Sequence, residues 1–432
     1  MIIFFAISGV LMLYALRDYN KAFCILLCWR LFLNVNIGLK LPSLPLLAMD
    51  FVLVVYFLIL YKYRIKRIDD NSLPYPLWKV TKLFVFTDLA CAVFALGGPI
   101  LSLPPAMTHI ADLLFLCLLW KMITPCNINY IFRGLLITII IAGAYCVFEN
   151  YIEFNPLIQW EVINSQNQST EDWLKLYDND TRGYRAMSIF SHPIGAGANF
   201  AFLSVLMIYY WWLSRTKDFY IKIVPLVFLL AVVSSVMANS RSCLVYMGVA
   251  FLPLLRAKSS KIVLLITFFI ALIYLTGLSD FFANYTDLVT SIFDIDNKNG
   301  YVGSDKDMRL SQYSAGLKIF SEYPLFGVGD RGLQFYNDKA TVTALNGLES
   351  IWLQLIVCKG VLGLFTYIAF ILSIIRIKIS KQYKRIVVIL TLAYVALCSV
   401  TSLPGGFVYL HYLTIFYVIK QYYWKSNKQI QL

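Results

Sequence analysis

The chain has 432 residues, of which 59% are hydrophobic and only 14% are charged, and its mean hydropathy is +0.70. Soluble domains are about half apolar and about a quarter charged, so this composition excludes an ordinary soluble enzyme or binding module. The net charge of +13 comes from basic residues scattered over short segments rather than gathered into one face, which argues against binding to nucleic acid.

Repeated apolar runs predict an all-α polytopic membrane protein with about 12–14 transmembrane helices, because about 20 helical residues cross the apolar core of a bilayer. A helix also satisfies every backbone hydrogen-bonding group inside lipid. Met1 opens directly into an apolar run without the basic start of a signal peptide, so we expect a retained first span. The expected spans lie near residues 1–16, 22–39, 43–61, 79–98, 106–120, 130–151, 189–213, 222–238, 242–255, 261–281, 348–375, 386–402 and 406–420.

Two polar segments divide these spans into groups. The predicted organisation is N-terminal transmembrane helices over 1–151, a loop over 152–188, central transmembrane helices over 189–281, a large and partly helical loop over 282–347, and C-terminal transmembrane helices with a tail over 348–432. Each boundary lies where an apolar run meets a polar stretch, because lipid excludes irregular polar backbone.

Basic residues orient the chain in the membrane. Lys and Arg concentrate in short loops near 62–67, 215–222, 256–261 and 376–385. The positive-inside rule makes these loops cytoplasmic. The two long polar segments are then on the outer side of the membrane.

Cysteine and histidine usage argues against disulfides and metal sites. The nine cysteines all lie in or at the ends of apolar runs, as small buried hydrophobic residues do. The three histidines are far apart in the sequence. No nucleotide-binding or zinc-protease motif occurs, so we expect neither a metal nor another cofactor.

The large outer loop is expected to contain a helix. Ser304 or Asp305 is the candidate cap at its start, and Pro324 is expected to stop it. Four apolar residues fall at three- and four-residue steps, which is the spacing of one face of a helix: Leu310, Tyr313, Leu317 and Phe320.

Three inward-running helices begin on the outer side beside a conspicuous polar residue, namely Arg185, Arg241 and Glu349. The N-terminus of such a helix carries free N–H groups and a partial positive charge. Neighbouring arginines therefore predict an anion site, most naturally for phosphate, which the guanidinium binds bidentately. The competing interpretation is that the arginines only anchor the spans to lipid headgroups. Glu349 is either a general base or a carboxylate that the helix dipole stabilises.

Further polar residues on the outer side are candidates for substrate binding: Arg182, Arg309, His192 and Ser240. Arg309 has the alternative of pairing with Asp305 or Asp307 on the same helical turn. His192 has the alternative of a loop residue at a helix start. Charged residues within the predicted spans must be paired or must face a polar cavity, as a proton or ion path or as a structural network. They are Arg30, Asp50, Asp88, Asp112 and Glu149.

The order of several motifs resembles a known family. An Arg, Phe and Pro series precedes one span at Arg185, Phe190 and Pro193, and Ser240 with Arg241 opens another. An arginine, a Pro-Leu-x-Gly-x-Gly turn and a Gly-x-x-Gly pair follow at Arg309, Pro324, Leu325, Gly327, Gly329, Gly360 and Gly363. Over about residues 182–365 this series is similar to the bacterial O-antigen polymerase and O-antigen ligase superfamily of membrane glycosyltransferases.

The resemblance implies a metal-independent, inverting glycosyl transfer at the periplasmic face of the bacterial inner membrane. The implied donor is a glycan on undecaprenyl diphosphate, and the implied acceptor is the sugar end of another lipid-linked repeat unit. Membrane lipids and a polysaccharide chain-length regulator protein are the other implied partners. Ligases of the family carry a His-Asn pair where this chain has Glu349 and Ser350, so the resemblance favours a polymerase. It implies that Arg185 and Arg241 stabilise the diphosphate, with Arg182 or Arg309 assisting.

Two other functions stay open from the sequence. An O-antigen ligase would use the same donor and transfer the glycan to lipid A core. A lipid-linked oligosaccharide flippase or ion-coupled transporter would explain the charges within the spans. The long outer loop and the lack of a detectable internal repeat argue against a transporter.

Overall fold

The computed structural model describes residues 2–33, 37–39, 47–64, 73–164, 184–214, 219–256, 306–345, 348, 350–401 and 408–430. The chain forms two compact units. Unit 1 comprises Met1–Leu53 and Thr124–Gly303, and unit 2 comprises Val54–Ile123 and Ser304–Leu432. The units follow contacts between distant segments, whereas the five-part division expected above follows chain order and stays a prediction.

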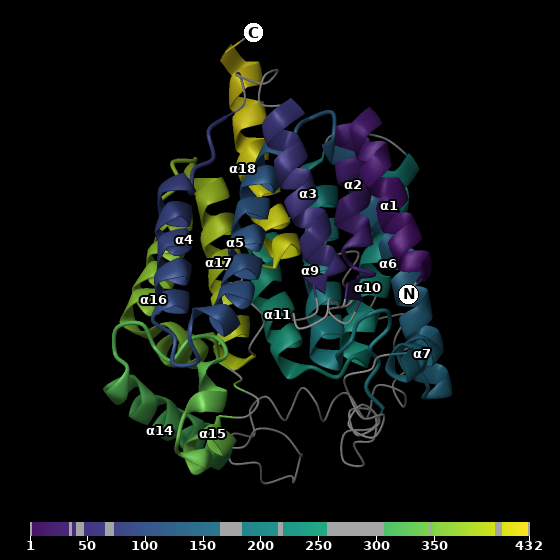
Figure 1. Ribbon diagram of the computed structural model, residues 1–432. Helices are drawn as coiled ribbons and strands as arrows, with labels where there is room; N and C mark the ends of the chain where they lie inside the picture. Colours follow the sequence, from purple (N-terminus) through teal and green to yellow (C-terminus); the bar gives the residue numbers. More distant parts are fainter. Residues whose placement is uncertain are drawn as a thin grey trace. The chain divides into compact units, whose positions relative to one another are not determined.

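Unit 1 is built around one buried helix. Its elements are α1 (Ile2–Arg17), α2 (Tyr19–Trp29), β1 (Gly38–Leu39), β2 (Leu47–Ala48), the start of α3 (Met49–Arg64), α6 (Ile128–Ile152), α7 (Pro156–Asn164), α9 (Pro193–Leu213), α10 (Phe219–Met237) and α11 (Arg241–Arg256) (Figure 1). Helix α9 packs against α6, α10 and α11, and 78% of its apolar window is buried. The buried small residues Ala196, Ala198 and Ala201 allow this close approach of neighbouring helices.

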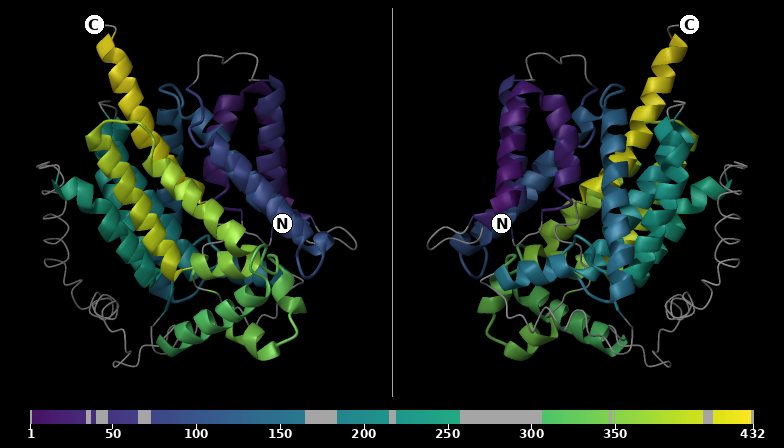
Figure 2. Two further views of the ribbon diagram at one scale, coloured as in Figure 1. Left: turned by 90° about the vertical axis from the view of Figure 1, so that its left-hand side faces the viewer. Right: turned by 90° about the vertical axis from the view of Figure 1, so that its right-hand side faces the viewer.

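Unit 2 contains the rest of α3 and the C-terminal helices. Its other elements are α4 (Trp78–Val93), α5 (Pro99–Met122), α14 (Lys306–Glu322), the short 3₁₀ helix η1 (Gly332–Phe335), α15 (Lys339–Ala344), α16 (Ile351–Ile375), α17 (Lys381–Val400) and α18 (Tyr409–Ile430). Helix α16 packs against α4, α14 and α17, and α18 packs against α5 and α17. Within this unit α14 and α15 lie together at one end, and α18 extends past α17 at the opposite end (Figure 2).

The predicted class, an all-α polytopic membrane protein, is confirmed. In the described part of the chain, six helices are long and apolar enough to cross a membrane, namely α5, α6, α9, α10, α16 and α17. Helices α1 and α11 are shorter apolar helices. The predicted span at 261–281 lies outside the described residues.

The second predicted span is wrong. An apolar run from 22 to 39 was expected to form one helix, but α2 ends at Trp29. Gly38–Leu39 instead pairs in antiparallel register with Leu47–Ala48, directly before α3. Strand pairing satisfies backbone groups as a helix does, and an apolar run does not by itself distinguish the two.

The helix expected in the large loop is present as α14, and the four apolar residues whose spacing indicated it form a mostly exposed face. Three of the four residues are exposed: Leu310 57%, Tyr313 43% and Leu317 57%. The buried face instead includes Ala315 and Ile319. A Cβ atom at Gly316 would lie 2.2 Å from Cδ1 of Leu353, so small residues let α14 approach α16 closely.

Candidate functional site

Arg185 lies in the connection between α7 and α9 of unit 1, which several elements hold in place. The Ala186 N–H donates to the carbonyl oxygen of Met237 at the end of α10, with a distance of 3.1 Å. The side-chain amide of Asn155 donates to the Ser188 carbonyl at 2.8 Å. Ser188 has a left-handed backbone with φ of 54°, which a non-glycine residue keeps only where its surroundings fix it.

The carboxylate of Glu149 supplies a second anchor for this connection. It projects from the last turns of α6 and is fully buried. One oxygen accepts the Met187 N–H at 2.8 Å and the Tyr184 hydroxyl at 3.0 Å, and the other accepts the Ser188 N–H at 2.5 Å. An ionised carboxylate only accepts hydrogen bonds, so three converging donors suit it. Glu149 thus binds the chain on both sides of Arg185.

The buried Nε of the Arg185 guanidinium has no hydrogen-bond partner among the described residues. Burial lowers the pKa of Arg185 from its ordinary value. The group stays charged at neutral pH because the ordinary value is so high. It lies within electrostatic range of the Cys243 thiol in the first turn of α11. A charged fork with a free donor is suited to binding an anion.

His192 caps the N-terminus of α9. Its Nδ1 accepts the Ile194 N–H at 3.1 Å, so the other ring nitrogen carries the proton of the neutral ring. Burial, and next the charge of Arg185, lower the pKa of His192 to about 4. The imidazole is therefore neutral at pH 7, and its place is that of a helix cap near Arg185.

The turn before α11 packs against the beginning of α9. A Cβ atom at Gly197 would lie 3.2 Å from Cβ of Ser240 and 3.2 Å from Sγ of Cys243. Ser240 is buried, and its hydroxyl lies 3.2 Å from that of Ser242. Arg241 is the first residue of α11 and is partly buried. Unit 1 thus brings Arg185, His192 and the turn that carries Ser240 and Arg241 to one place, at the N-termini of two helices.

The remaining predicted site residues belong to other parts of the chain. Arg309 lies near the start of α14 and is partly buried. Ser350 stands at the N-cap of α16, and its hydroxyl lies 3.5 Å from that of Tyr313 on α14. Arg182 and Glu349 lie outside the described residues.

Helix α16 is broken at Gly360, where φ is 60° and ψ is −155°. The Pro-Leu-x-Gly-x-Gly turn enters this break with its own backbone. The Val328 N–H donates to the Val357 carbonyl at 2.9 Å, and the Val361 N–H donates to the Pro324 carbonyl at 2.8 Å. The turn therefore replaces hydrogen bonds that the helix loses, as a broken membrane helix requires.

The glycines of this region are needed for close approach. A Cβ atom at Gly360 would lie 2.6 Å from the carbonyl group of Leu325. A Cβ atom at Gly327 would lie 2.5 Å from the carbonyl oxygen of Val357, and its φ is 66°. Glycine alone adopts such positions without strain. These glycines lie where the backbone of the turn contacts the backbone of α16.

Residues 226–368 match the family model described as O-antigen ligase. This segment is an O-antigen ligase family domain. No curated protein matches the chain. The resemblance found in the sequence is thus confirmed, and it supports a function of the polymerase or ligase type in O-antigen biosynthesis, with lipid-linked substrates.

The O-antigen ligase family domain covers part of the predicted site. It contains Ser240, Arg241, Arg309 and the broken helix α16 as far as residue 368. Arg185 precedes it in sequence, although its segment is bonded to Met237 within the domain.

A buried ion pair accompanies the break in α16. Lys359, directly before Gly360, contacts the carboxylate of Asp88 on α4, and both side chains are almost fully buried. The Lys359 ammonium also lies 3.1 Å from Nδ1 of His109 on α5. Nδ1 of His109 lies 3.8 Å from a carboxylate oxygen of Asp330, which follows the glycine turn. No local pattern in the sequence indicates this cluster, because its members are up to 271 residues apart.

Several of the charges within the predicted spans have partners. Arg30 binds Asp50 bidentately, with both distances 2.7 Å. Asp88 pairs with Lys359, and Glu149 accepts hydrogen bonds from the Arg185 connection. These contacts favour a structural network over a continuous proton or ion path for these four groups.

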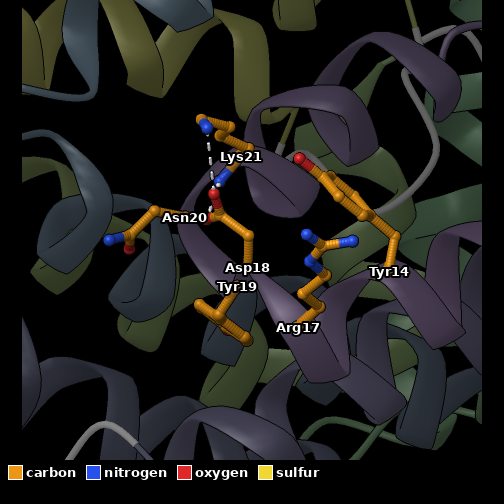
Figure 3. Close-up of a pocket in the computed structure, with 6 residues that line it drawn as sticks. All are labelled: Tyr14, Arg17, Asp18, Tyr19, Asn20 and Lys21. Atoms are coloured by element: carbon orange, nitrogen blue, oxygen red, sulfur yellow. Dashed lines mark hydrogen bonds and ion pairs between the residues drawn. The ribbon is translucent and has the colours of Figure 1, made fainter.

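A polar pocket occurs at the corner between α1 and α2 in unit 1. It is lined by Tyr14, Arg17, Asp18, Tyr19, Asn20 and Lys21 (Figure 3). Lys21 and Asp18 form an ion pair across 3.3 Å. The pocket contains none of the predicted site residues. Within the described part of the chain, no group of three or more His, Cys, Asp or Glu side chains is placed to hold a metal ion.

Proposed function

We propose that this protein is an O-antigen polymerase of the bacterial inner membrane. It transfers the growing glycan from undecaprenyl diphosphate onto a lipid-linked repeat unit at the periplasmic face. The observation that carries the proposal is the charged guanidinium of Arg185, whose Nε has no hydrogen-bond partner among the described residues. It lies beside the first turns of two helices within unit 1.

The proposed chemistry is a displacement at the anomeric carbon of the donor sugar. The acceptor hydroxyl oxygen forms the new bond to that carbon, while the bond to the diphosphate oxygen breaks with inversion. Negative charge develops on the lipid diphosphate, and cations at its oxygens stabilise it in the transition state. Arg185 and Arg241 take this role, and the N–H groups at the start of α9 and α11 add partial positive charge.

The remaining candidates assist this reaction in the proposal. Arg182 or Arg309 contributes to binding the diphosphate, and Ser240 and the neutral His192 shape the site around Arg185. Glu349 accepts the proton of the acceptor hydroxyl as a general base. No metal ion is required, since the arginines carry the compensating charge. A polysaccharide chain-length regulator protein is a proposed partner.

A ligase is the second candidate, because the family model that matches residues 226–368 is described as O-antigen ligase. Glu349 and Ser350 favour the polymerase, since they replace the His-Asn pair of the related ligases. Ser350 is the N-cap residue of α16.

The deciding experiment is the lipopolysaccharide pattern of a deletion strain, with the gene restored on a plasmid as the control. A polymerase loss leaves core with a single repeat unit. Bare core would instead contradict the polymerase, since the loss of either a ligase or a flippase leaves core without attached glycan.

Glu349→Gln is then tested in vitro with purified lipid-linked repeat units, at matched amounts of stable protein. Loss of a positioned base is expected to slow chain growth about 10²-fold or more. Near-normal growth would show that Glu349 is not the general base.

A further inference from the structure

Glu149 contacts the Arg185 connection at three points that lie on both sides of the arginine. One donor is the hydroxyl of Tyr184, the residue directly before Arg185. The other two are the backbone N–H groups of Met187 and Ser188, two and three residues after it. All three distances lie between 2.5 and 3.0 Å. Hydrogen bonds to an ionised acceptor are stronger than those between neutral groups. This carboxylate therefore fixes the backbone from which the arginine projects.

Glu149 holds Arg185 without neutralising it. No ion pair between the two side chains occurs among the described contacts. The negative charge is instead satisfied by backbone and hydroxyl donors. An arginine paired with a carboxylate would have to lose that partner before it could bind a phosphate. The arrangement gives a fixed arginine whose charge is available.

Other contacts confine the same connection but do not replace this one. Ser188 uses its hydroxyl to donate to the Ala142 carbonyl at 2.7 Å, and its carbonyl accepts from Asn155. Those contacts hold the backbone after the arginine. Glu149 bridges the residue before the arginine and the residues after it.

We infer that Glu149 is a positioning residue for the anion site, one that orients Arg185 through the backbone and does not touch the substrate. The inference rests on the proposed function, because it assigns Arg185 to the diphosphate. It predicts that Glu149 affects anion binding only as long as Arg185 is present.

The test is a double-mutant cycle on the full-length protein purified in detergent, with inorganic diphosphate as the probe. Arg185→Ala is expected to weaken binding about 10-fold or more, since hydrogen bonds to charged groups are worth that much. Glu149→Gln places an amide donor against a backbone donor, and is expected to weaken binding roughly 3- to 10-fold. In the Arg185→Ala background, Glu149→Gln is expected to change affinity less than about two-fold, because coupled residues are not additive.

Glu153→Gln is the matched control. It makes the same substitution one turn further along, at the exposed C-cap of α6, and is expected to leave binding unchanged. A general loss of stability would weaken binding in both backgrounds alike. A loss of affinity on Glu149→Gln that occurs only when Arg185 is present therefore distinguishes a positioning role from a merely structural one.

The outcomes for the two proposals differ. If Arg185→Ala leaves diphosphate affinity unchanged, the anion site and the proposed function are wrong. If Arg185→Ala weakens binding but Glu149→Gln has no effect, or an equal effect in both backgrounds, only the positioning role is wrong. If Glu149→Gln does not yield folded protein, Tyr184→Phe takes its place in the cycle. It removes one donor and is expected to weaken binding about two- to three-fold, again only where Arg185 is present.

Discussion

Two connections between helices are fixed in different ways, one in each unit. In unit 1 the Arg185 connection is held by side chains, with the Glu149 carboxylate accepting backbone N–H groups. In unit 2 the Pro324–Gly329 turn is held by backbone groups that complete the broken helix α16. The first leaves a charged side chain available, whereas Lys359, beside the helix break that the second completes, is buried against Asp88.

This difference separates the motifs that resemble the family into two kinds. The glycines at 327 and 360 are required by backbone contact, because a side chain there would collide with another segment. Arg185 is not required for packing in the same sense, since its Nε makes no hydrogen bond among the described residues. We therefore expect substitutions at these glycines to lower stability more than activity. Substitutions at Arg185 are expected to lower activity more than stability.

The largest effect is expected for Arg185→Lys and Arg241→Lys on polymer formation. Lysine keeps the charge but loses the planar fork that binds phosphate bidentately. We expect chain growth from lipid-linked repeat units to fall about 10²-fold, as for loss of one transition-state donor. Arg376→Lys, at the C-cap of α16, is the control and is expected to be silent. Normal glycan ladders from both outer variants, at normal protein levels, would make these arginines lipid anchors.

Lys359→Met is expected to have the largest effect on stability. It leaves the Asp88 carboxylate buried without its cation, and removal of one partner of a buried pair costs about 3–5 kcal/mol. The measurement is the free energy of unfolding in mixed detergent micelles. Combining Lys359→Met with Asp88→Leu is expected to restore most of the loss, because an apolar pair of similar volume needs no compensation. If Lys359→Met and the wild type have the same free energy of unfolding, the Lys359–Asp88 pair does not stabilise the fold.

Gly360→Ala tests the backbone contact in unit 2. Alanine would adopt a conformation that is almost confined to glycine, with its Cβ 2.6 Å from the Leu325 carbonyl group. We expect a loss of about 3 kcal/mol in unfolding free energy. Gly248→Ala is the control, since its Cβ would meet no atom within 4 Å. A helical alanine there is expected to be neutral or to stabilise by roughly 0.5–1 kcal/mol. Similar stabilities for the two variants would contradict a tight turn-to-helix contact.

The sequence predicted the parts of the fold that depend on composition and local pattern. Apolar runs located most of the helices, and Pro324 correctly marked the end of the α14 region. For α14 the three- and four-residue spacing predicted a helix, but it did not indicate which residues contact α16. Helices in this protein approach through small residues such as Ala315 and Gly316.

The candidate site was predictable only in part, for a related reason. Arg185 and Arg241 were singled out because the positive-inside rule predicts them to lie on the outer side, where arginine is unexpected. Glu149 and Lys359 carry partners that lie 35 or more residues away, so no local pattern reveals them. Glu149 was recognised as a charge that needs a partner, but its partner is a stretch of backbone, which no residue type identifies.

The smallest effect is expected at His192, and it depends on pH. The folded pKa of about 4 lies below the ordinary value of 6.5, because burial and Arg185 disfavour the charged ring. The unfolded chain therefore binds more protons than the folded protein between these two values. Stability is highest above pH 6.5 and falls as the pH drops toward 4.

His192→Asn keeps a side chain that caps a helix well but removes the titrating group. At pH 7 the variant and the wild type are expected to differ little in unfolding free energy. Between pH 7 and pH 5 the wild type is expected to lose roughly 1–2 kcal/mol more than the variant. Thermal or detergent unfolding at the two pH values measures this difference. Parallel pH profiles would show that the ring is charged or solvated in the folded protein. In that case His192 would add positive charge beside Arg185, and the anion site would strengthen in acid rather than keep a constant charge.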